Sequence, residues 1–182
     1  MTKKVIIALD NKNLKEIINL VKKTRSHAFG FKIGKEFFYN YGIEGYKKIY
    51  KLSSNIFLDL KLHDIPNTVK KGILAISKLN PYFTTIHLSG GDEMQIQANL
   101  SKKNIKILGV SILTSLNSEQ THKFYFNKDI KKIVSNYTNY ALNHNLDGIV
   151  CSPAEIKIIK DIAGDKLLIV TPGIRPENWL LF

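Results

Sequence analysis

Seven short runs of β-branched and aliphatic residues recur along the 182-residue chain, and segments with helical spacing separate them. The runs are typical of buried strands and lie at residues 5–9, 29–33, 56–60, 83–88, 105–111, 148–151 and 166–170. Between them, apolar residues fall three or four positions apart, as in Leu14, Ile17, Ile18 and Val21. A strand followed by a helix, repeated, indicates parallel strands with right-handed crossovers, and therefore an α/β sheet or barrel.

Polar residues lie within or just after nearly every run, among them Asp10, Lys32, Asp59, His87 and Ser152. A doubly wound sheet concentrates its chemistry in one crevice where the strand order reverses, whereas a closed barrel uses the carboxyl ends of many strands. The distribution therefore favours a TIM (β/α)8-type barrel, organised as a single domain over residues 1–182.

Composition limits the classes of function. The formal net charge of +12 comes from lysines scattered over the helical segments, which indicates solvated helix faces rather than a nucleic-acid surface. A positive field would nevertheless attract an anionic substrate. No run reaches the roughly 18 apolar residues of a membrane span, and the single cysteine, Cys151, excludes an internal disulfide and is expected in the core. We expect a cytoplasmic protein whose fold depends on packing alone.

The segment FLDLKLHDIPNTV at residues 57–69 places two charges inside a predicted strand. Side chains alternate along a strand, so Asp59 and Lys61 share one face, and the other face carries Leu58, Leu60 and Leu62. If the leucines pack against helices, the charges point into the barrel, where unpaired charge costs several kcal/mol. They must then pair with each other and with further ions, for which Asp64 and Lys32 are candidates. Spacing alone leaves catalytic and structural roles open.

Residues 59–68, DLKLHDIPNT, resemble the signature of orotidine 5'-monophosphate decarboxylases. Other stretches agree in order and spacing: ALD at 8–10, FKIG at 31–34, HLSGG at 87–91, GVSILTS at 109–115, DGIVCS at 147–152 and VTPGIRP at 170–176. Decarboxylases and aldolases that act on sugar phosphates share the spaced Asp, Lys and Asp. The HDIPNT continuation, however, is similar to the orotidylate branch.

The resemblance implies a lyase of pyrimidine biosynthesis that removes CO2 from C6 of orotidine 5'-phosphate and yields UMP, with no cofactor and no metal. Lys61 would stabilise the developing carbanion and donate the proton to C6, and Asp59 would lie beside the substrate carboxylate. Lys32 would complete the charge array and contact the ribose, while Asp10 would accept a ribose hydroxyl. Asp64 is the remaining carboxylate expected among the catalytic groups.

The same resemblance implies a homodimer in which three residues reach into the neighbouring subunit's site: Asp64, Ile65 and Thr68. Thr114 would lie near the pyrimidine or its phosphate-side loop. Pro172 and Arg175 would begin the loop that closes over the ligand.

After Pro176 the family continues through a loop with a ligand-binding Gln, a helix, an eighth strand and a Gly-Arg pair that grips the phosphate. Residues 177–182 do not match that pattern, so we expect a C-terminally incomplete barrel with about seven strands. Two alternatives stand beside the decarboxylase. One is a Mg²⁺-dependent sugar-phosphate decarboxylase or synthase of the same superfamily, and the other is an inactive truncated fragment whose basic surface binds nucleic acid or a partner chain. His63 and His87 lack carboxylate or cysteine partners at zinc-type spacing, so neither is expected to bind metal.

Overall fold

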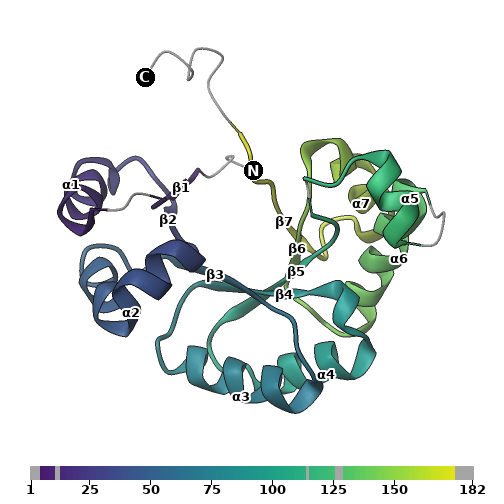
Figure 1. The fold of residues 1–182 in the computed structure, drawn as a ribbon, viewed down its shortest axis with the longest axis horizontal. Helices are drawn as coiled ribbons and strands as arrows, with labels where there is room; N and C mark the ends of the chain where they lie inside the picture. The colour runs from purple at the N-terminus through teal and green to yellow at the C-terminus, as the bar shows by residue number, and fades with distance from the viewer. Residues whose placement is uncertain (1–4, 11–12, 114, 126–128, 175–182) are drawn as a thin grey trace.

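A single curled sheet of seven parallel strands organises the molecule. The computed structural model describes residues 5–10, 13–113, 115–125 and 129–174. The strands are β1 (Ile6–Ala8), β2 (Gly30–Ile33), β3 (Ile56–Leu62), β4 (Phe83–His87), β5 (Lys106–Val110), β6 (Gly148–Val150) and β7 (Leu168–Val170). Each strand pairs with the one before it in the chain, in the order β1 to β7, without the reversal of a doubly wound sheet. This order and the curl of the sheet confirm the barrel prediction (Figure 1).

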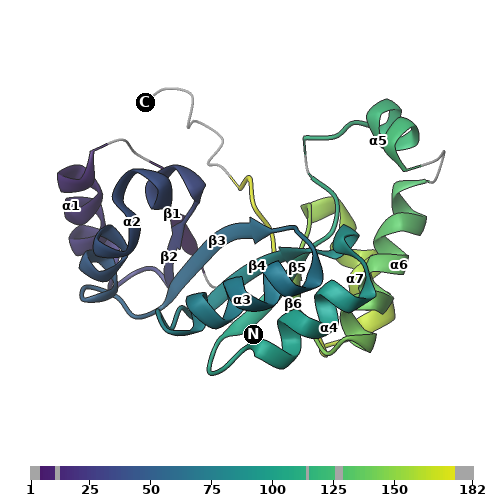
Figure 2. The ribbon, with the colours of Figure 1, turned by 60° about the horizontal axis from the view of Figure 1, so that its bottom comes forward.

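The helices follow the strands in sequence and cover the outside of the sheet (Figures 1 and 2). They are α1 (Leu14–Thr24), α2 (Lys35–Tyr50), α3 (Pro66–Ser77), α4 (Asp92–Ser101), α5 (Ser118–Phe124), α6 (Ile130–Asn143) and α7 (Ile156–Ala163), with short 3₁₀ turns at η1 (Leu88–Gly90) and η2 (Pro153–Glu155). Of these, α5 stands away from the sheet (Figure 2). The helix nearest the charged segment, α3, begins at Pro66, where a missing N–H costs nothing because the first turn has no acceptor for it.

Alternate residues of the strands contact two separate apolar clusters. The larger cluster joins strand residues such as Phe31 and Leu58 to helix residues such as Ile17 and Val69, so it fills the layer between sheet and helices. The smaller cluster contains strand residues and their neighbours only, and therefore lies on the concave face: Phe57, Phe83, Leu108, Val110 and Val150. Burial of both faces explains why the strand segments read as continuous apolar runs.

The predicted orientation of β3 is confirmed. Leu58 is fully buried in the larger cluster and Leu60 and Leu62 pack against it, whereas Phe57 belongs to the concave cluster. The next residues on the concave face are Asp59 and Lys61, and the sheet therefore turns both toward the interior of the curl.

The other predicted strands and helices agree with the structure apart from their ends. All seven predicted runs contain a strand, and β3 extends two residues beyond the predicted range to Leu62. Helix α2 is interrupted at Gly42, whose φ of 55° and ψ of −152° are not helical. Cys151 is buried as predicted, and burial raises the pKa of its thiol to about 12, so it behaves as a small core residue. Within the described ranges, no helix has the length and apolar character needed to cross a bilayer.

Candidate active site

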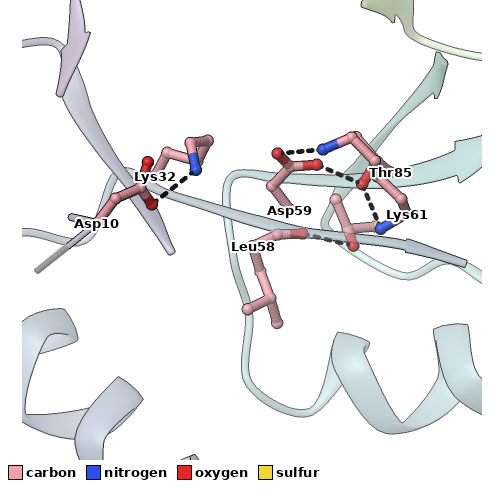
Figure 3. Close-up of polar contacts among 7 residues, drawn as sticks. Asp10, Lys32, Leu58, Asp59, Lys61 and Thr85 are labelled. Atoms are coloured by element: carbon pink, nitrogen blue, oxygen red, sulfur yellow. Dashed lines mark hydrogen bonds and ion pairs between the residues drawn. The ribbon is translucent and has the colours of Figure 1, made fainter. Parts of the chain in front are cut away.

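Charged and polar side chains from four consecutive strands or their ends, β1 to β4, lie on the concave side of the sheet (Figure 3). Asp10 follows β1, Lys32 lies in β2, Asp59 and Lys61 lie in β3, and Thr85 lies in β4. In parallel α/β folds, ligands and reactive groups assemble at the carboxyl ends of the strands, because the strand ends and the βα loops that follow them converge there.

Asp59 and Lys61 form the closest ion pair of the group. The Lys61 Nζ lies 2.7 Å from Asp59 Oδ2, and the other carboxylate oxygen of Asp59 accepts a hydrogen bond of 2.9 Å from the Thr85 hydroxyl. The Asp59 side chain is 9% exposed and that of Lys61 is 30% exposed. The carboxylate is therefore held at both oxygens, while the ammonium keeps a route to solvent or to a bound molecule.

The backbone beneath this pair is irregular. Leu58 pairs with Thr84 and Leu62 with Ile86, so three residues of β3 lie opposite Thr85 alone. Lys61 has φ of 50°, a left-handed conformation that is uncommon for a residue with a side chain and that concentrates at functional sites. The observed geometry marks Lys61 as a position whose conformation is imposed by its neighbours.

A second ion pair joins β1 to β2. The Lys32 Nζ lies 3.2 Å from Asp10 Oδ1, and no ion pair links Lys32 to Asp59 among the described residues. Gly34 leaves room for this pair, since a Cβ at that position would lie 3.0 Å from the Lys32 ammonium. The charge array expected from sequence is thus two separate pairs on one face of the sheet, as Figure 3 shows.

The three residues expected at a subunit interface lie together around the start of α3. Asp64 accepts a hydrogen bond of 2.7 Å from the Ile65 backbone and, in the described structure, makes no ion pair with Lys61. Ile65 is 67% exposed, and Asp64 and Thr68 are also exposed. Together with His63 and Ser89, Asp64 and Ile65 border an open hollow of about 360 Å³. These side chains are therefore accessible from outside the chain.

Two histidines flank the Lys61 end of the site. The rings of His63 and His87 lie 5.1 Å apart between centroids. Burial, and then electrostatic repulsion from His63, Lys61 and Lys35, lower the pKa of His87 to about 4, so His87 is neutral near pH 7. Among the described residues, no group of three or more His, Cys, Asp or Glu side chains is arranged to hold a metal ion.

Of the three remaining residues predicted to lie near the ligand, the structure describes one. Pro172 is exposed just beyond β7, in the segment that the sequence assigned to the closing loop. Thr114 and Arg175 lie outside the described residues. No sequence feature predicted a role for Thr85. Threonine is common in β-strands, and the residues next to Thr85 belong to no recognisable motif.

A curled parallel βα sheet with paired charges at the carboxyl ends of its strands defines the class of protein: a barrel-type enzyme fold with its site on the C-terminal face. The model of the Orotidine 5'-phosphate decarboxylase / HUMPS family matches residues 3–179, and the chain belongs to that family.

Individual relatives agree with the family match. The chain is 43% identical over 178 residues to the orotidine 5'-phosphate decarboxylase of Staphylococcus saprophyticus, covering 95% of this chain and 77% of the relative. It is 40% identical over 179 residues to that of Ligilactobacillus salivarius, covering 93% and 76%. The crystal structure of orotidine 5'-phosphate decarboxylase from Lactobacillus acidophilus superposes with a TM-score of 0.85 at 37% identity, covering 96% of this chain and 82% of that one.

Proposed function

We propose that this chain catalyses the decarboxylation of orotidine 5'-phosphate to UMP in pyrimidine biosynthesis, without a metal ion or organic cofactor. The observation that carries the proposal is the Lys61 ammonium, held 2.7 Å from Asp59 on the concave face of a sheet shared with enzymes of that name. A cation fixed in place before reaction stabilises developing negative charge without reorganisation.

The proposed chemistry begins with cleavage of the bond between C6 and the carboxylate carbon. CO2 leaves, and the electron pair of the broken bond remains on C6 next to the Lys61 ammonium. Lys61 then transfers a proton to C6, which completes UMP, and the neutral amine regains a proton from solvent through its exposed surface. Asp59 would lie beside the substrate carboxylate and repel it. This repulsion disfavours the bound reactant more than the transition state, because the substrate carboxylate loses its negative charge as it becomes CO2.

The other predicted residues would bind the parts of the substrate that do not react. Lys32 and Asp10 would contact the ribose hydroxyls, since their ion pair already lies at the same end of the sheet. Thr114 would lie near the pyrimidine or its phosphate-side loop, and Pro172 and Arg175 would begin the loop that closes over the ligand. Binding energy from such remote groups can hold a site closed and be realised in the transition state.

We further propose that the active unit is a homodimer. The exposure of Asp64, Ile65 and Thr68, and the lack of a bond from Asp64 to its own Lys61 in the described structure, fit side chains that enter a neighbouring site. Sedimentation of the purified protein across a concentration series tests this arrangement directly.

Turnover is measured as loss of orotidylate absorbance, comparing the wild type with Lys61→Ala and with Lys47→Ala. Lys47 is the matched control because it is a surface lysine of α2, 57% exposed and paired with Glu44. Removing Lys61 is expected to lower kcat by roughly 10²- to 10⁴-fold or more, as for loss of a general acid. Lys47→Ala and addition of a chelator are expected to leave turnover unchanged. A folded wild-type dimer that fails to consume orotidylate would refute the proposal.

A further inference from the structure

Thr85 is the most constrained polar residue of the site. Its side chain is completely buried at the middle of β4, on the concave face between Phe83 and His87. Its hydroxyl makes two hydrogen bonds to the catalytic segment of β3: it donates to Asp59 Oδ1 at 2.9 Å and accepts from the Lys61 backbone N–H at 2.9 Å. One hydroxyl thus contacts both members of the ion pair.

The two bonds fix each other's direction. A hydroxyl has a single proton, and Asp59 as a carboxylate can only accept, so that proton is committed to Asp59. The oxygen lone pairs are then left for the Lys61 N–H, which is displaced from the regular ladder by the register irregularity of β3. Without the Thr85 hydroxyl, this part-buried N–H would have no acceptor, which destabilises the local conformation.

Lys61 needs this support because its backbone is not in a relaxed conformation. Its φ of 50° places it in the left-handed region, which persists only where surrounding contacts determine it. The Thr85 hydroxyl supplies such a contact at the residue itself, while holding the carboxylate that orients the Lys61 ammonium.

We propose that Thr85 is a positioning residue for decarboxylation. It sets the location of the Lys61 ammonium by holding the Lys61 backbone from one side and the Asp59 carboxylate from the other. The proposal rests on the function proposed above and extends it to a residue that touches neither substrate nor reacting atoms.

The neighbouring residue offers a matched control. Thr84 is also completely buried, and its hydroxyl donates to the Leu58 carbonyl at 3.0 Å, on the face of the sheet opposite Thr85. Thr84→Val and Thr85→Val therefore remove the same group from adjacent buried positions of one strand. Thr85→Ser keeps the hydroxyl and removes only a methyl group.

Two measurements are made on the four proteins after circular dichroism and dimerisation have been compared. The first is kcat and KM for orotidine 5'-phosphate. The second is hydrogen exchange of the Lys61 amide by NMR, without substrate. We expect Thr85→Val to lower kcat by about 10²-fold, as for a misplacement near 1 Å, with KM close to the wild-type value. The Lys61 amide should exchange several-fold faster in that variant. Thr85→Ser and Thr84→Val should stay near the wild type in both measurements.

Turnover by Thr85→Val at the wild-type rate, an equal loss in Thr84→Val, or unchanged exchange at Lys61 each overturn the positioning role. A wild type that folds but does not turn over refutes the proposed function instead. In that case the exchange rate of the Lys61 amide still decides whether Thr85 holds the Lys61 backbone.

Discussion

We predict that His87 makes the folded protein less stable in acid. Its ring is half-buried at the end of β4. Electrostatic interactions with His63, Lys61 and Lys35 disfavour its protonation, and Asp59 acts in the opposite direction. Burial and these unfavourable interactions lower its pKa from the ordinary 6.5 to about 4 in the folded protein. Between these two values the unfolded chain binds a proton that the folded protein does not bind, so the free energy of unfolding falls as the pH falls from about 6.5 toward 4.

The size of the effect follows from that gap. The full gap would correspond to about 3 kcal/mol, but solvent screens a half-buried ring, so we expect a loss of about 1 kcal/mol between roughly pH 7 and pH 5. The assay is urea unfolding at these two pH values for the wild type, His87→Asn and His27→Asn. His27 is the control because it is an exposed histidine remote from the ion pairs.

The expected result is that His87→Asn removes about 1 kcal/mol of the pH-dependent loss, whereas His27→Asn retains the loss of the wild type. An identical decrease in all three proteins would show that acid sensitivity arises elsewhere, and the assignment to His87 would be wrong.

Two glycine substitutions test how closely neighbouring groups approach. Gly34→Ala would place a Cβ 3.0 Å from the Lys32 ammonium, a flexible end that can shift by a few tenths of an ångström. We therefore expect kcat/KM for orotidylate to fall several-fold while the melting temperature stays close to that of the wild type. A clear fall in the melting temperature of Gly34→Ala would contradict this reasoning. Gly148→Ala would place a Cβ 2.3 Å from the Leu168 backbone carbonyl, so β6 and β7 must separate and urea unfolding should show a loss of about 1–3 kcal/mol. An unchanged urea midpoint would mean that the strands relax freely there.

The order of strands was predictable because it depends on information carried locally. Runs such as residues 105–111 are apolar on both faces, which only a strand covered on both sides requires, and their regular separation by helical spacing implies parallel crossovers. The alternation in β3 likewise predicted that Asp59 and Lys61 share a face and pair with each other.

The finer geometry of the site depends on how neighbouring strands pair. That pairing cannot be predicted from the residue pattern of a single sequence. The irregular register opposite Thr85 and the left-handed backbone of Lys61 have no local sequence marker such as glycine. The separation of Lys32 from Asp59 depends in the same way on where β1 places Asp10 relative to β2. These features depend on how neighbouring strands pair, whereas sequence periodicity specifies only which face of a strand a side chain occupies.

The sequential order of the sheet also bears on how the molecule is made. Every strand pairs with its predecessor. Both ion pairs and the Thr85 hydroxyl come from the first four strands and the residues just after them, within residues 10–85. Contacts between elements that are close in the chain form with little loss of loop entropy. The N-terminal strands are also synthesised first, so they can pair before the later strands exist. The charged groups are therefore complete once β4 docks, and every later strand joins a sheet that already holds both ion pairs.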